Sequence, residues 1–216
     1  MNENTNTITW ELKESTLTIK GNGAMQDYSP LNAPWYPQRM SIIAIIIEDG
    51  IESIGNNAFS MCSDLTSITI SNSVTNIGKN AFECCDKLTS INIPNSVISI
   101  KTSAFFACGL TSVVIPNSVI SIKRDTFACC KSLISITISD SITSIEDAFW
   151  GCENLKHIYL QCTTPISINK YFTEKSFSTL ANSCILHVPV GSKDKYEQTE
   201  RWKEFNNIQE DIITNY

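Results

Sequence analysis

The feature that most constrains the fold is an internal repeat of 22 or 23 residues, which phenylalanine marks. The marker residues are separated by steps of 23, 23, 22 and 22 residues, and they are Phe59, Phe82, Phe105, Phe127 and Phe149. Each follows alanine or threonine, and five or six residues later a leucine opens the pattern L-x-x-I-x-I, with Val or Leu for one Ile in two copies. A unit of this length buries almost nothing alone, so stacked copies must share one continuous core.

The L-x-x-I-x-I segment predicts a short β-strand whose side chains alternate between core and solvent. In the copy that starts at Leu65, the alternation places Ile68 and Ile70 inward and Ser67 and Thr69 outward. Because all copies run in the same direction, neighbouring strands are expected to pair in parallel at a spacing of about 4.8 Å. A turn rich in Pro, Asn, Asp and Ser follows each strand.

The two ends of the chain depart from the repeat, as the caps of a solenoid must. Residues 1–40 hold two alternating segments that predict a β-hairpin cap. Residues 41–161 hold the regular repeats, and residues 162–216 hold a diverged repeat and a C-terminal cap of strand and helix. We expect residues 1–216 to form a single domain. The helical lid is expected to bury one apolar face, formed by Tyr196, Trp202, Phe205 and Ile208.

These features resemble the BspA-like, treponemal-type class of leucine-rich repeats, whose unit reads L-T-S-I-x-I-P-x-S-V-x-S-I-G-x-x-A-F-x-x-C. The segment from Leu65 to Cys85 matches that pattern at nearly every position. The resemblance implies a right-handed leucine-rich-repeat solenoid, mostly β with short irregular or helical returns. It also implies a non-enzymatic, adhesin-like interaction module of a secreted or cell-surface protein, which binds host or neighbouring-cell macromolecules.

Composition narrows the class of partner and the location. The chain has 16 Lys and Arg against 22 Asp and Glu, so a basic surface for nucleic acid is not expected. The longest apolar run, Ile42 to Ile47, is far shorter than the ~18 residues of a membrane span. The first residues, Met1 to Asn6, show no secretion signal. We therefore expect either a trimmed mature form, secreted or on the cell surface, or a cytoplasmic protein.

Five of the nine cysteines recur three residues after the marker phenylalanine, at Cys62, Cys85, Cys108, Cys130 and Cys152. The pattern is open to three interpretations: a metal or redox cluster, disulfides, or a ladder of free thiols. No C-x-x-C pair is present, which disfavours a metal. Equivalent side chains in parallel repeats point the same way, whereas a disulfide needs Cβ atoms that converge to about 3.8 Å. We therefore predict free thiols packed as small hydrophobic groups.

The outward positions of the predicted strands form the candidate partner-binding concave face. It consists of Ser67, Thr69, Ser90, Asn92, Ser112, Val114, Ser135, Thr137, His157 and Tyr159. Most of these residues are small and polar, which suits a sheet that is only solvated and favours a structural spacer or assembly module. Because binding faces are enriched in aromatic residues, a hot spot is expected at His157 and Tyr159. The alternative is that Tyr159 packs under the C-terminal cap.

The sequence contains no recognisable pattern of catalytic residues. The chain has two histidines, His157 and His187, and neither lies in a Ser-His-Asp or Cys-His signature. We therefore expect no catalytic, cofactor-binding or metal-ligating residue and no cofactor. The expected partner is a protein or another macromolecule, without nucleic-acid binding or membrane insertion.

Overall fold

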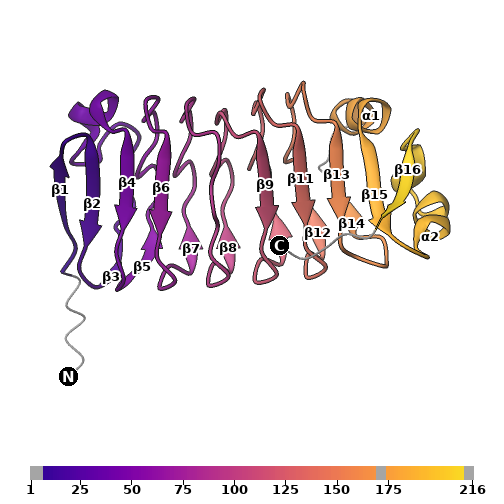
Figure 1. Cartoon of the computed structure of the whole chain (residues 1–216), viewed down its shortest axis with the longest axis horizontal. Helices are drawn as coiled ribbons and strands as arrows, with labels where there is room; N and C mark the ends of the chain where they lie inside the picture. Colours follow the sequence, from indigo (N-terminus) through magenta and orange to yellow (C-terminus); the bar gives the residue numbers. More distant parts are fainter. Residues whose placement is uncertain (1–6, 169–173, 212–216) are drawn as a thin grey trace.

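The computed structural model describes residues 7–168 and 174–211. It shows an elongated solenoid whose strands lie side by side along the long axis (Figure 1). The longer strands form two sheets on one side, with the orders β1-β2-β4-β6 and β9-β11-β13-β15-β16. Their bounds are β1 Thr9–Lys13, β2 Thr16–Lys20, β4 Ala44–Ile47, β6 Ser67–Ile70, β9 Ser112–Ile115, β11 Ser135–Ile138, β13 His157–Leu160, β15 Ile185–Pro189 and β16 Ile208–Asp211. We call the outward side of these sheets the long-strand face.

Shorter strands on the return path form two further sheets, β3-β5-β7-β8 and β10-β12-β14. They are β3 Gly23–Ala24, β5 Ile51–Ile54, β7 Asn76–Ile77, β8 Ser99–Ile100, β10 Ser121–Ile122, β12 Ser144–Ile145 and β14 Ser167–Ile168. Helices lie at the two ends of the solenoid (Figure 1). They are the 3-10 helices η1 Tyr36–Ser41 and η2 Trp202–Glu204 and the α-helices α1 Glu174–Ser183 and α2 Lys193–Gln198.

The pairing of the repeat strands confirms the expected parallel arrangement. Ile45 of β4 lies opposite Ile68 of β6, and Ile136 of β11 lies opposite Ile158 of β13, all in parallel register. The hairpin of β1 and β2 is antiparallel, as predicted for the N-terminal cap. The repeat period of the sequence is therefore the stacking period of the solenoid.

One repeat lacks its expected strand. Residues 91–93 do not pair with the strands on either side, so the long-strand sheet is interrupted there. Proline follows the strand position in this repeat and in the next one, at Pro94 and Pro116. At the same position in other repeats, the amide of Glu48 donates to the Ile19 carbonyl and that of Gln161 donates to the Ile138 carbonyl. Proline has no N–H, so the ladder loses a hydrogen bond on each side of this segment.

The core is a continuous stack of aromatic rings along the solenoid axis. Trp35 begins it, and the five marker phenylalanines continue it with neighbouring ring centroids 5.4 to 6.1 Å apart. The backbone supports the stack, since the amide of Phe82 donates to the Ala104 carbonyl of the next repeat at 2.8 Å. Leucine and isoleucine ladders from the strands fill the remaining interior.

The C-terminal cap differs from the single helical lid that the apolar spacing predicts. Tyr196, Trp202, Phe205 and Ile208 are all buried, as expected. However, α2 ends at Gln198, and Ile208 belongs to β16, which pairs in parallel with β15. The open edge of β15 offers backbone groups that a strand satisfies and a helix does not. No helix in the described part of the chain is long and apolar enough to cross a membrane.

Candidate interaction face

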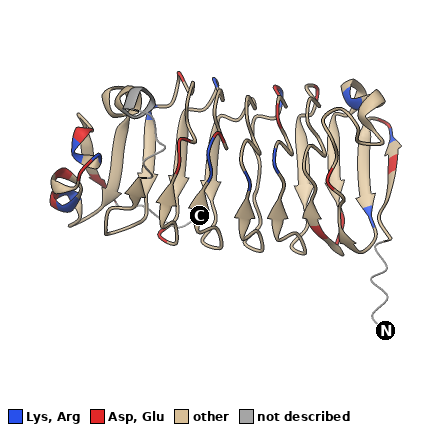
Figure 2. Cartoon of the chain, turned by 180° about the vertical axis from the view of Figure 1, so that it is seen from behind, with Lys and Arg blue, Asp and Glu red and all other residues tan. Residues whose placement is uncertain are grey.

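Eight of the ten residues predicted for the partner-binding face lie on strands of the long-strand face, Ser90 and Asn92 lie in the unpaired segment between β6 and β9, and none of the ten is buried. Ser67, Thr69, Ser90, Asn92, Ser112 and Val114 are exposed, and Ser135, Thr137, His157 and Tyr159 are half-buried. Strands β6, β9, β11 and β13 carry no Lys, Arg, Asp or Glu. In Figure 2, Lys, Arg, Asp and Glu lie mainly on the connecting segments and the caps. The middle of the face is thus neutral and built of small side chains.

A hollow lies where the long-strand sheet is interrupted. It has a volume of about 640 Å³ and is lined by Asn72, Ile91, Asn92, Ile93, Pro94, Asn95, Ser96, Val114 and Pro116. The unpaired segment of residues 91–93 forms one side of it, and the 43% exposed side chain of Val114 forms another. Amide and aliphatic groups, without charge, are therefore the chemistry that this part of the face offers a partner.

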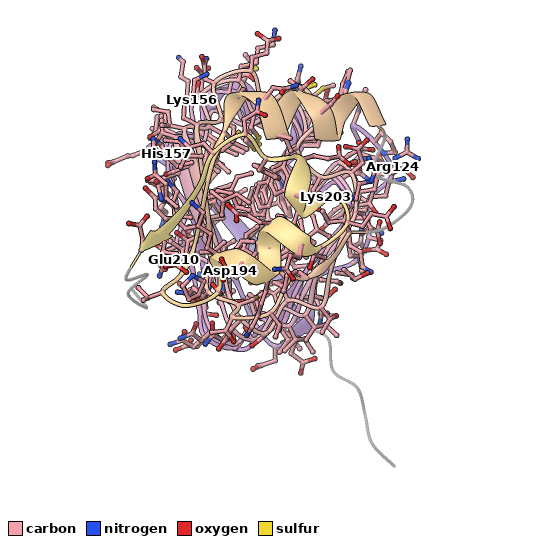
Figure 3. All side chains as sticks on the ribbon, turned by 90° about the vertical axis from the view of Figure 1, so that its right-hand side faces the viewer. Arg124, Lys156, His157, Asp194, Lys203 and Glu210 are labelled. Carbon is pink, nitrogen blue, oxygen red and sulfur yellow. The ribbon has the colours of Figure 1, made fainter. Side chains whose placement is uncertain are left out.

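The C-terminal end of the face has a different composition, with a Tyr and two His in contact. The Tyr159 ring stacks on the His187 ring with centroids 4.2 Å apart. His157 Nδ1 lies 3.0 Å from His187 Nε2, and His187 Nδ1 forms a hydrogen bond with a carboxylate oxygen of Asp211. Figure 3 shows His157 at the edge of the molecule when it is viewed from this end. We call these four residues the His-Tyr cluster.

Strand register brings the His-Tyr cluster together from segments far apart in the sequence. Tyr159 of β13 lies opposite His187 of β15, and Pro189 of β15 lies opposite Asp211 of β16. The sequence analysis identified His157 and Tyr159 but missed the roles of His187 and Asp211. Aligning Ile185–Val188 with His157–Leu160 as one more repeat strand would have placed His187 beside Tyr159. Nothing in the repeat pattern indicates β16, which supplies Asp211.

The geometry of Tyr159 lies between the two predicted alternatives. Its ring contacts the cap strand through His187, yet it stays half-exposed on the long-strand face. The residue is therefore held in one orientation by stacking and still presents surface to a partner. Its proposed role as a hot spot stays a prediction.

The nine cysteines are free, as predicted. The register cysteines are buried, and each thiol from the second repeat onward donates to the carbonyl of the marker phenylalanine in the preceding repeat, as Cys108 Sγ does to Phe82 O at 2.9 Å. The matching bonds join Cys85 to Phe59, Cys130 to Phe105 and Cys152 to Phe127. The cysteine ladder is thus a structural element that satisfies carbonyls beside the aromatic stack.

Thiol reactivity tests this assignment. Desolvation by burial raises the pKa of Cys62 and of Cys152 to about 12, so neither is a thiolate near pH 8. We expect a thiol reagent to label only the half-buried Cys84 and Cys129 in the folded protein at that pH, and all nine cysteines after denaturation without reductant. Mass spectrometry of the labelled peptides shows which cysteines react in the folded protein and which react after denaturation. Rapid labelling of Cys152 in the folded protein would contradict the buried ladder.

In the described part of the chain, no group of three or more His, Cys, Asp or Glu is arranged to hold a metal ion. The His-Tyr cluster contains an Asp-His pair but its hydrogen bonds run to a second imidazole. Such a chain orients imidazole rings and shares a proton between them. Together with the stacked tyrosine, it gives this end of the face aromatic and hydrogen-bonding groups that the rest lacks.

Comparison with known families and structures agrees with this architecture. The model of the BspA type leucine-rich repeat region, in six copies, matches residues 36–108 and 75–187. The chain belongs to the BspA-type leucine-rich repeat family. Membership indicates a protein-interaction module, and the repeats and fold of this family are typically non-enzymatic. A search of curated proteins found no match to the chain.

Solved leucine-rich repeat proteins of bacteria have a similar BspA-type fold. A leucine-rich repeat protein from Eubacterium ventriosum is 29% identical, with a TM-score of 0.64 over 78% of this chain and 43% of that one. One from Bacteroides ovatus is 27% identical, with a TM-score of 0.56 over 70% and 45%. The T. pallidum leucine-rich repeat protein is 21% identical, with a TM-score of 0.56, and the match covers 82% of this chain and 94% of that one. The chain therefore spans less than half of the first two relatives.

Proposed function

We propose that this BspA-type chain is an adhesin-like binding module of a secreted or cell-surface protein, and that its partner is a host or neighbouring-cell protein. The observation that carries the proposal is the composition of the long-strand face. Along most of its length the face is neutral and carries small side chains, and the His-Tyr cluster lies at its C-terminal end. Aromatic residues dominate the binding energy of protein interfaces, whereas serine and threonine contribute little.

The order within the His-Tyr cluster supports an anchor at Tyr159. Stacking on His187 fixes the ring before a partner arrives, so little side-chain entropy is lost on binding. The neighbouring Ser135 and Thr137 are small, which leaves room for a partner to reach the ring from the N-terminal side. On the N-terminal side of the ring, strand β11 carries no charged residue that a partner would have to match.

The test compares Tyr159→Ala with Tyr159→Phe and with Thr69→Ala, which lies at the other end of the same column of outward residues. Binding of the purified chain is measured to cultured epithelial cells and to a panel of immobilised extracellular-matrix proteins. We expect Tyr159→Ala to weaken binding about 30-fold, the equivalent of a 2 kcal/mol hot spot. The two control variants should bind nearly as wild type, and the melting temperature of all three should change little.

A second function, that of a spacer, is favoured by one specific observation. Ser67, Ser90, Ser112 and Ser135 repeat one small polar side chain along the face, which suits a sheet that contacts only water. A wild-type chain that binds neither cells nor any protein of the panel would support the spacer and contradict the binding module.

A further inference from the structure

The two histidines of the chain meet at the C-terminal end of the long-strand face, with ring nitrogens 3.0 Å apart. The His187 side chain is 8% exposed, and the Asp211 carboxylate that accepts its Nδ1 proton is 44% exposed. A carboxylate on Nδ1 keeps the proton on that nitrogen, so the Nε2 lone pair of a neutral His187 ring points toward His157.

We propose that His157 Nδ1 and His187 Nε2 bind a divalent first-row transition-metal cation of the Zn²⁺ type, with Asp211 as the residue that orients His187. Imidazole nitrogen is a preferred ligand of these cations. Histidines that bind metals almost always donate their other ring nitrogen to a carboxylate or a carbonyl, and His187 already donates to Asp211. The proposal concerns the cation alone and does not depend on the partner proposed above.

The spacing of the two rings suits a shared cation. A Zn–N bond is about 2.0–2.1 Å, so each ring centroid lies about 3.2 Å from the metal, and two tetrahedral ligands have centroids about 5.2 Å apart. The centroids of His157 and His187 are 5.2 Å apart. The centroid spacing therefore already suits a shared cation, and each ring must turn so that its nitrogen leaves the line between the rings, which opens the gap between the nitrogens from 3.0 Å to about 3.3 Å.

The hydrogen bond between the rings identifies the proton that must move. In the metal-free cluster one proton lies between the two nitrogens, and a cation takes its place. That proton passes to the other nitrogen of His157 or to solvent, while the proton between His187 and Asp211 stays. The two imidazoles leave the remaining coordination positions to water or to a ligand from outside the chain. The net charge of −6 favours a bound cation.

The experiment titrates metal-free full-length protein with Zn²⁺ by calorimetry and follows the imidazole nitrogens by NMR. The chain has two histidines, so the spectrum of the His157→Asn variant assigns the imidazole signals of both. We expect one Zn²⁺ per chain, with both histidines shifting at the same stoichiometry. His157→Asn should weaken binding at least tenfold, and Asp211→Asn about 10- to 100-fold, because it removes only the orienting carboxylate.

Two controls separate this site from other Zn²⁺ ligands. Asp194→Asn removes the same charge from the exposed surface of the neighbouring helix α2 and should leave the affinity unchanged. A Cys84→Ser, Cys129→Ser double variant removes the two accessible thiols and should also bind as wild type. Wild-type protein that shows no saturable Zn²⁺ binding, or His157→Asn protein that binds equally well, would reduce the pair to a hydrogen bond and overturn the proposal. Neither result would bear on Tyr159 and its protein partner.

Discussion

Phe105→Ala is expected to lower the free energy of unfolding by about 3–5 kcal/mol, among the largest effects of a single substitution in this chain. Phe105 is fully buried and stacks on Phe82 and Phe127 with interplanar angles of 3° and 5°. Truncation removes its contacts with both neighbours and leaves a cavity in the middle of the aromatic stack. Neighbouring repeats contact only each other, so no distant part of the core can close that cavity.

Thermal and denaturant unfolding measure this loss, and the adjacent phenylalanine provides a matched control. At this chain length, a loss of 3–5 kcal/mol corresponds to a fall of about 6–20 °C in melting temperature. Phe106 is half-buried and does not belong to the stack, so Phe106→Ala should cost clearly less. Equal losses for Phe105→Ala and Phe106→Ala would contradict the view that the stack holds the repeats together.

The repeat period allowed most of the solenoid to be predicted, because one structural unit recurs and equivalent positions make the same contacts in each copy. The inward Ile70, the stacked Phe82 and the free Cys108 all follow from their place in the unit. The interruption at residues 91–93 was not predicted. Pro94 and Pro116 belong to the turn-forming segments of the sequence pattern, but each also removes a donor from the sheet.

The candidate site was harder to predict than the fold, since it depends on the part of the chain that leaves the repeat. Tyr159 and His157 stand at repeat positions and were found by comparing copies. His187 lies in the diverged repeat, and Asp211 lies in β16, whose pairing satisfies an open sheet edge rather than continuing a pattern. Contacts between non-repeating segments come from tertiary packing, which a single sequence does not encode in a local period.

Gly109→Ala is the second substitution with a large expected effect, and its cause is space rather than backbone conformation. A Cβ atom at Gly109 would lie 1.9 Å from the carbonyl oxygen of Asp86, which belongs to the preceding repeat. The two backbones are also joined by the Gly109 amide, which donates to the Cys85 carbonyl at 3.2 Å. Because a backbone carbonyl cannot rotate away as a side chain can, the two repeats must separate. We expect a loss of about 3 kcal/mol.

The position explains one of the 22-residue steps in the sequence. Between the register cysteine and the next leucine, this repeat has only Gly109, whereas the preceding repeat has Asp86 and Lys87. The shorter connection draws the chain against its neighbour, and only a residue without Cβ fits there. Gly191→Ala is the control, since its Cβ would meet nothing within 4 Å and its φ of +81° adds only a conformational cost of about 1 kcal/mol. If denaturant unfolding shows Gly109→Ala to be no more destabilising than Gly191→Ala, close backbone contact is not what sets the length of this repeat.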